Sequence, residues 1–237
     1  SLLAQVDAAI GGKTGVNHQE GKNLIGSFYQ PDFVFIDSKT LETLDKRELK
    51  CGLAEVIKYG DISDKSLFDY IEKHSDTLKS LDPKKDLGIW THLIERSVAN
   101  KASVVEKDEK ESGIREILNF GHTLGHAIES VYDYERYLHG EAIAIGMIKA
   151  ADLAYAEGIL DKLSYLRLSR LLENLGFETA LPEDLDTEKL ISHLSVDKKI
   201  KQGVLRFILP IKIGETTVYN CPSMDRIREL LRNRKEA

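Results

Sequence analysis

Three histidines stand close together near the middle of the sequence. His122 and His126 are four residues apart, so both would lie on one face of a helix, and His139 follows thirteen residues after His126. Imidazoles from two buried elements suit a divalent cation such as zinc, which takes three protein ligands and leaves a fourth position for water or substrate. The spacing leaves open whether His122 pairs with His126 or with His139. Hydrogen-bonded core histidines are the alternative.

An acidic and a basic residue interrupt an apolar segment earlier in the chain. Within residues 51–60, Glu55 and Lys58 share the polar face of a predicted helix. A charged pair among so many apolar residues needs a compensating partner. A carboxylate is the usual third ligand of a zinc ion held by two histidines. The H-E-x-x-H pattern of the common metalloproteases is absent from the sequence.

Glycines stand beside lysines near the start of the chain. The runs Gly-Gly-Lys at 11–13 and Gly-Lys-Asn at 21–23 could present backbone N–H groups to an oxyanion that the ammonium neutralises. A P-loop is excluded because Asp7 stands where that motif requires glycine. The alternative is a solvated glycine loop.

A run of charged residues precedes the histidines. Residues 101–115 would normally form a solvated helix end and loop. Their position directly upstream of the histidine segment makes Lys101, Glu111 and Arg115 candidates for the same site. The Asp-Lys-Lys run at 197–199, taken alone, is more typical of the surface.

The elements that must position these residues are mainly helical. Apolar periodicity predicts a helical bundle from about Asp45 to Leu194, with Gly176 as a helix C-cap. Before it, the apolar run 32–37 predicts a buried strand that follows glycine-rich loops. After it, residues 203–210 and 214–219 predict a β-hairpin, and a final amphipathic helix is expected over about 223–234.

Composition excludes several classes of protein. The 237 residues carry 33 Lys and Arg against 39 Asp and Glu, a net charge of −6, which argues against a nucleic-acid binder with a broadly basic surface. The longest apolar stretches, such as 142–148, fall far short of the roughly 20 residues that cross a bilayer. Two cysteines without a C-x-x-C pairing favour neither a disulfide scaffold nor a thiolate zinc site, and the cytoplasm is the expected compartment.

Four segments together resemble the 3-dehydroquinate synthase family. They are Asp7 with Gly-Gly-Lys-Thr-Gly-Val-Asn at 11–17, Gly-Leu-Ala-Glu-Val-Ile-Lys at 52–58, Asn-Phe-Gly-His-Thr-Leu-Gly-His at 119–126, and Leu-His-Gly-Glu at 138–141. The match runs from the first residue to the final helix. It implies the multi-helical C-terminal domain of that fold (45–237), preceded by a remnant (1–44) of the α/β NAD-binding domain. The chain opens where the dinucleotide-binding half is ending, so we expect most of that half to be missing.

The resemblance also implies roles for individual residues. The metal ligands would be Glu55, His122 and His139, and the acid/base groups would be His126 and Glu111. The substrate pocket would be lined by Asp7, Lys13, Asn23, Lys58, Lys101, Arg115, Asn119 and one of Lys198 or Lys199, with Lys199 favoured. NAD would be contacted by Ser1, Lys13, Lys22, Thr40, Leu41, Glu42 and Thr43.

The implied reaction converts 3-deoxy-D-arabino-heptulosonate 7-phosphate to 3-dehydroquinate and phosphate, in the shikimate pathway of aromatic amino acid biosynthesis. The implied cofactors are Zn²⁺ or Co²⁺ and NAD⁺, and the expected partner is a phosphorylated sugar acid rather than nucleic acid or a membrane. The family implies a homodimer for the full-length enzyme. Because the dinucleotide-binding half is missing, we expect little or no activity from this chain alone. The alternatives are another sugar-phosphate cyclase of the 2-deoxy-scyllo-inosose synthase type, a metal-dependent alcohol dehydrogenase, and a helical module that does no catalysis.

Overall fold

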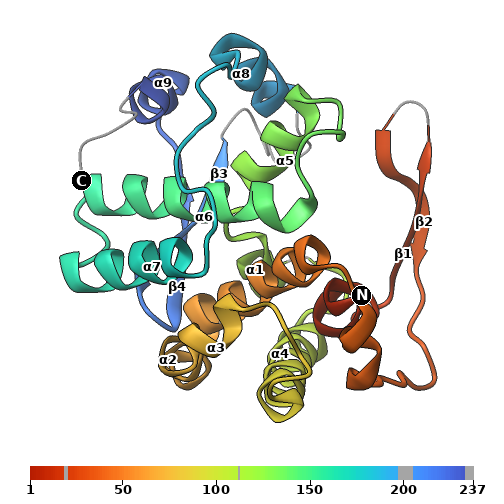
Figure 1. The fold of residues 1–237 in the computed structure, drawn as a ribbon. Helices are drawn as coiled ribbons and strands as arrows, with labels where there is room; N and C mark the ends of the chain where they lie inside the picture. Colours follow the sequence, from red (N-terminus) through yellow and green to blue (C-terminus); the bar gives the residue numbers. More distant parts are fainter. Residues whose placement is uncertain (19–20, 112, 197–204, 233–237) are drawn as a thin grey trace.

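The fold is known from a computed structural model, which describes residues 1–18, 21–111, 113–196 and 205–232. In these residues helices dominate, and two small antiparallel hairpins flank them (Figure 1). The elements are, in order, η1 Ala4–Ala8, β1 Lys13–His18, β2 Gly21–Phe28, η2 Ser38–Thr43, α1 Lys46–Ser63, α2 Lys65–Lys73, α3 Ser75–Lys79, α4 Leu87–Lys107, η3 Ile114–Asn119, α5 His122–Val131, α6 His139–Ala156, α7 Lys162–Asn174, α8 Thr187–Val196, β3 Arg206–Lys212, β4 Glu215–Asn220 and α9 Met224–Arg232. The predicted mainly helical fold is confirmed.

Aspartates mark where several helices begin. The side chains of Asp45, Asp64, Asp86 and Asp161 each accept a hydrogen bond from a backbone N–H in the first turn of the helix that follows, at α1, α2, α4 and α7. This contact satisfies a donor that has no partner within the helix. At the other end of α7, Gly176 adopts the left-handed conformation with φ +76°, as its predicted role of C-cap requires.

Helix α6 is the centre of the molecule. It is buried on nearly all sides, and α1 and α5 pack against it (Figure 1). Two glycines allow the close approach: a Cβ atom on Gly140 would lie 2.0 Å from the carbonyl oxygen of Cys51 in α1, and one on Gly146 would lie 2.0 Å from the carbonyl oxygen of Gly121. Backbone therefore packs directly on backbone, and the middle of α1 is brought together with the first turns of α5 and α6, which carry the other candidate ligands.

The C-terminal hairpin covers the other side of this core. In β3 the side chains of Phe207, Ile208 and Leu209 are buried, and the strand packs against α6 and pairs with β4. The turn of the hairpin is fixed to α1, because the backbone N–H of Gly214 donates to the carbonyl oxygen of Asp61 at 2.7 Å. Both the hairpin and the final helix α9 agree with the sequence prediction. No helix in the described part of the chain is long and apolar enough to span a membrane.

The N-terminal segment differs from its prediction. The glycine-rich residues expected to form a loop instead make the β1–β2 hairpin, which stands along one side of the helices (Figure 1). The run 32–37, predicted as a buried strand, is not a strand, and Phe33 and Phe35 are 81% and 85% exposed. A strand needs a neighbouring strand for its backbone hydrogen bonds and a packed face for its side chains. The described residues provide neither beside this run.

Candidate metal and substrate site

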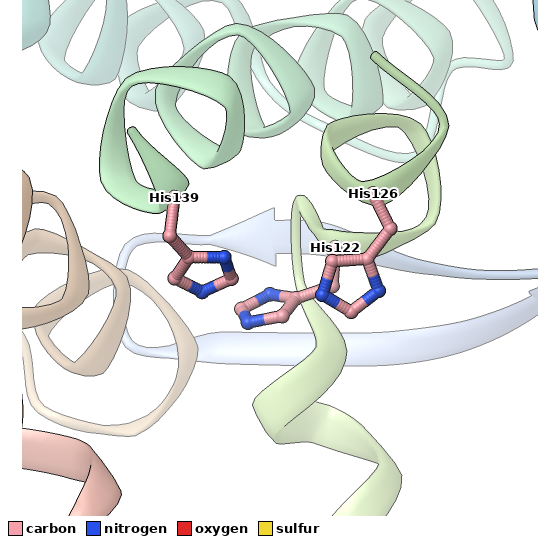
Figure 2. A group of neighbouring side chains, drawn as sticks. All are labelled: His122, His126 and His139. Carbon is pink, nitrogen blue, oxygen red and sulfur yellow. The ribbon is translucent and has the colours of Figure 1, made fainter. Parts of the chain in front are cut away.

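The three histidines converge from two helices. His122 is the first residue of α5, His126 lies one turn further along it, and His139 is the first residue of α6. The three rings lie together (Figure 2). Their centroids are 5.2 to 5.7 Å apart. One ring nitrogen from each residue lies within 4.8 Å of the others, which is close enough for a shared metal ion. Gly121 makes the sharp entry to α5 with φ +77°, where a Cβ atom would lie 2.6 Å from Met147.

Glu55 joins this group from α1. Its Oε1 atom lies 3.5 Å from Nε2 of His122 and 3.5 Å from Nε2 of His139. The side chain is fully buried and forms an ion pair with Lys58, which is 1% exposed. Burial alone would raise the pKa of Glu55, but the charges of Lys58 and His139 outweigh it and hold the pKa at about 2. The carboxylate is therefore ionised and ready to act as a ligand.

The donor set fits a divalent cation. Among the described residues, Oε1 of Glu55 has no hydrogen-bond donor although it is sealed from solvent, while Oε2 is paired with Lys58. Buried polar atoms are normally satisfied, so an oxygen left without a hydrogen bond beside two imidazole nitrogens indicates a missing ligand. One carboxylate and two imidazoles match the composition of catalytic zinc sites. The distances also accommodate the three histidines as the ligand set.

The Nδ1 atoms of His122 and His139 each face a hydrogen-bond acceptor. Nδ1 of His122 lies 2.9 Å from the carbonyl oxygen of Phe120, and Nδ1 of His139 lies 3.3 Å from Oε2 of Glu129. Burial would lower the pKa of His139, but Glu129 and Glu55 raise it to about 9. Our sequence reasoning did not select Glu129. The signal was its isolated charge in an otherwise apolar stretch of helix, three residues after His126.

A second cluster forms around Asp7 in η1. Lys101 donates to Oδ1 of Asp7 at 2.8 Å and to its backbone carbonyl oxygen at 2.7 Å, and the hydroxyl of Tyr59 donates to the same Oδ1 atom at 2.7 Å. Burial would raise the pKa of Asp7, but Lys58 and Lys101 lower it overall. The shared influence of Lys58 places this cluster in electrostatic reach of Glu55. Tyr59, which is fully buried, was also missed from the sequence.

A third cluster surrounds Glu111. Its carboxylate forms an ion pair with Lys13 of β1 and accepts a hydrogen bond from Nδ2 of Asn119 at 3.1 Å. Burial would raise the pKa of Glu111, and the contacts with Lys13 and Asn119 lower it instead. Its backbone has φ +58°, a left-handed conformation that is strained for a residue with a side chain. Three of the predicted site residues are thus brought together here.

Arg115 is buried and bonded to the backbone of two loops. It is 1% exposed, and its guanidinium donates to the carbonyl oxygens of Glu109 and Gly11. These bonds fasten the loop before η3 to the turn before β1.

The residues predicted to contact NAD lie at the N-terminal end. Ser1 is exposed, and residues 40–43 belong to η2, where Thr40 accepts a hydrogen bond from Gln5 at 2.9 Å. Leu41 is fully buried, so its side chain is part of the core. Lys22 and Asn23 lie in β2, but their side chains are outside the described part of the structure, and Lys198 and Lys199 lie outside the described residues altogether.

Comparison with protein families matches residues 1–200 of the chain. Residues 1–51 match the family described as 3-dehydroquinate synthase N-terminal, and residues 52–200 match the one described as 3-dehydroquinate synthase C-terminal. The 3-dehydroquinate synthase of Prochlorococcus marinus (strain NATL1A) is 48% identical over 98% of this chain and 62% of its own length. That of Dictyoglomus thermophilum is 50% identical over 97% of this chain and 63% of its own length. The chain therefore spans less than two thirds of these relatives.

Two solved structures are similar to this chain over nearly all of its length. The 2-epi-5-epi-valiolone synthase of Streptomyces hygroscopicus subsp. jinggangensis 5008, with NAD⁺ and Zn²⁺ bound, has a TM-score of 0.88 at 29% identity, over 98% of this chain and 64% of that one. A 2-deoxy-scyllo-inosose synthase in complex with carbaglucose-6-phosphate, NAD⁺ and Co²⁺ has a TM-score of 0.85 at 30% identity, over 99% of this chain and 65% of that one.

Proposed function

The chain belongs to the 3-dehydroquinate synthase family, and from that premise we propose that it supplies the metal and substrate site of an enzyme that converts 3-deoxy-D-arabino-heptulosonate 7-phosphate to 3-dehydroquinate and phosphate. The observation that carries the proposal is the position of one buried carboxylate oxygen of Glu55, 3.5 Å from Nε2 of both His122 and His139. We propose these three residues as ligands of Zn²⁺ or Co²⁺.

The proposed cofactors would supply the chemistry that side chains lack: the metal ion would polarise the substrate hydroxyl, and NAD⁺ would serve as the hydride acceptor and donor. The ketone formed in the substrate acidifies the neighbouring C–H bond, so phosphate can be eliminated. We propose that His126, whose ring lies 5.2 Å from that of His122, holds or moves the proton of the hydroxyl that is oxidised. Glu111 is the second proposed proton-transfer group.

Charged side chains of the chain suit the two anionic groups of this substrate. A carboxylate and a phosphate require several cations for binding, and Lys58 and Lys101 lie on the buried side of the site. The other proposed substrate contacts are Asp7, Lys13, Asn23, Arg115, Asn119 and Lys199. The proposed NAD contacts are Ser1, Lys13, Lys22, Thr40, Leu41, Glu42 and Thr43. A cytoplasmic homodimer, and a boundary between the two domains at 44/45, are also proposed.

The relatives favour this substrate over that of another cyclase. Identity to the 3-dehydroquinate synthases is 48–50%, against 29–30% to the structurally similar valiolone and inosose synthases. An assay that supplies the heptulosonate phosphate and a hexose 6-phosphate separately, with Zn²⁺ and NAD⁺, tests the choice through phosphate release. Release from the hexose phosphate alone would contradict the proposal. Net accumulation of NADH would instead indicate a dehydrogenase, because a cyclase recycles its cofactor in each turnover.

We propose that the chain without the rest of its family's NAD-binding domain binds the metal ion but turns over little substrate. Metal content of the purified chain and phosphate release measure the two properties independently. Turnover at a rate typical of a complete enzyme, on the order of 1–10³ s⁻¹, would contradict this part of the proposal.

A further inference from the structure

A buried carboxylate lies behind the histidine that begins α6. Glu129 is on α5 and is 2% exposed, and its Oε2 atom lies 3.3 Å from Nδ1 of His139. The opposite nitrogen of the same ring, Nε2, lies 3.5 Å from Oε1 of Glu55. One imidazole ring is therefore placed between two buried carboxylates that come from different helices.

We propose that Glu129 is a positioning residue for the metal site: it holds the proton of His139 on Nδ1 and so presents Nε2 to the cation. An ionised carboxylate can only accept a hydrogen bond, so the nitrogen that faces Glu129 must carry the hydrogen. In a neutral ring this leaves the lone pair on Nε2, the atom that faces Glu55. The inference rests on the proposed function, in which His139 is a metal ligand.

The neighbouring histidine provides an internal comparison. Nδ1 of His122 lies 2.9 Å from the carbonyl oxygen of Phe120, and a carbonyl oxygen also can only accept. Both rings are thus held at Nδ1 and turn Nε2 toward Glu55. They differ in their acceptor, which is a neutral backbone group for His122 and a charged side chain for His139. A change at position 129 should therefore release one ring and leave the other in place.

The charge of Glu129 adds to its geometric role. Glu55 and Glu129 place two negative charges around one ring, and Lys58 compensates the first of them. A divalent cation bound at Nε2 is favoured by negative charge close to the ring that binds it. Glu129→Gln keeps the size and one acceptor oxygen but loses the charge, whereas Glu129→Ala loses both. Outer partners of metal-bound histidines typically contribute 10–100-fold in affinity. We therefore expect a loss in that range for alanine and a smaller loss for glutamine.

The test is a titration of the metal-free chain with Zn²⁺ in competition with a chromophoric chelator. The matched control is Glu135→Gln, because Glu135 is an exposed acidic residue in the segment between the two helices. Nuclear magnetic resonance of the zinc-loaded chain provides a second measurement, the exchange of the ring N–H protons with solvent. We expect slow exchange for both His122 and His139 in the unsubstituted chain, and fast exchange for His139 alone in Glu129→Ala. In Glu129→Gln, the exchange of the His139 ring proton should be slower than in Glu129→Ala.

The outcomes separate this inference from the proposed function. Unchanged zinc affinity in Glu129→Ala, with a slowly exchanging His139 proton, would overturn the positioning role while the metal site stands. Loss of both ring protons in alanine and glutamine variants alike would show a general structural role and would also overturn the inference. If the unsubstituted chain binds no Zn²⁺, the proposed function itself fails.

Discussion

Replacement of Asp61 by alanine should stabilise the protein. Asp61 lies in the last turn of α1 with no exposed surface, and among the described residues neither of its carboxylate oxygens has a hydrogen-bond partner. Burial raises the pKa of this carboxyl from its ordinary value of 3.8 to about 8. A carboxylate that loses its water without gaining a donor is destabilising, and alanine removes that group at the cost of a small cavity.

The magnitude follows from the linkage between proton binding and folding. Between pH 4 and pH 8 the folded chain keeps the Asp61 proton while the unfolded chain has lost it, so stability falls as the pH rises through this window. The slope is about 1.4 kcal/mol per pH unit, so the free energy of unfolding should fall by about 3 kcal/mol from pH 5 to pH 7.5 through this group. Because an alanine side chain does not titrate, Asp61→Ala lacks this dependence. At pH 7.5 we expect it to be more stable by about 1–3 kcal/mol.

Urea unfolding at pH 5, 6.25 and 7.5 measures the effect. The fluorescence of Trp90, the single tryptophan, reports unfolding because its side chain is fully buried. Asp76→Asn, at an exposed position in α3, controls for the loss of one acidic charge. The difference between Asp61→Ala and the unsubstituted chain should grow with pH, while Asp76→Asn runs parallel to the unsubstituted chain. A constant difference across the three pH values would refute the reasoning.

Three further predictions concern the helix contacts, a helix cap and the metal. Gly140→Ala should lower the free energy of unfolding by more than about 3 kcal/mol, because a Cβ atom 2.0 Å from the carbonyl oxygen of Cys51 forces α6 away from α1. Chemical denaturation measures this loss, and a value below about 1 kcal/mol would be inconsistent with that contact. Asp64→Ala should cost about 1–3 kcal/mol at pH 7, since it removes the cap of α2 and the ion pair with Arg96. Despite burial, hydrogen bonds from Asn100 and Arg96 and from the backbone lower the pKa of Asp64. The stability that the Asp64 carboxylate contributes is therefore present above the ordinary pKa of 3.8 and is lost as the pH falls below it. An equal loss of stability in Asp64→Ala at pH 2.5 and at pH 7 would contradict this. Zn²⁺ at 100 times its Kd should stabilise the chain by about 2.7 kcal/mol in thermal melts, and the same addition to His122→Ala should have far less effect.

Sequence patterns predicted most of the helical fold because helix formation depends on local signals. The periodicity of α1, α4 and α7, and the turn residues around β3 and β4, lie within a few residues of the structure they specify. The prediction of a strand at 32–37 was wrong for the opposite reason. Its apolar composition is that of a strand, but strand formation depends on a partner, and a local pattern contains no information about whether one is present.

The residues of the candidate site also fall into those that the sequence predicted and those that it did not. Glu55, His122 and His139 could be selected because each stands in a short motif, and the structure brings them together. Their supporting residues, Glu129 and Tyr59, have no motif of their own. Each acts through a contact with a residue on another element, so the packing of the elements is needed to identify its partner. The backbone bonds of Arg115 are of this kind too, because they join residues of two loops that lie far apart in the sequence.

The backbone contacts of α6 have a consequence for how the site tolerates change. At Gly140 and Gly146 no side chain lies between α6 and its neighbours, so no rotamer can adjust to absorb a displacement there. Larger side chains elsewhere in the core can repack around a substitution. A side chain added at Gly140 or Gly146 would instead displace the whole helix. The spacing between Glu55 and the two rings is therefore set by main-chain geometry. Substitution of Gly140 or Gly146 should therefore disturb that spacing more than substitution of a bulky core side chain whose neighbours can repack.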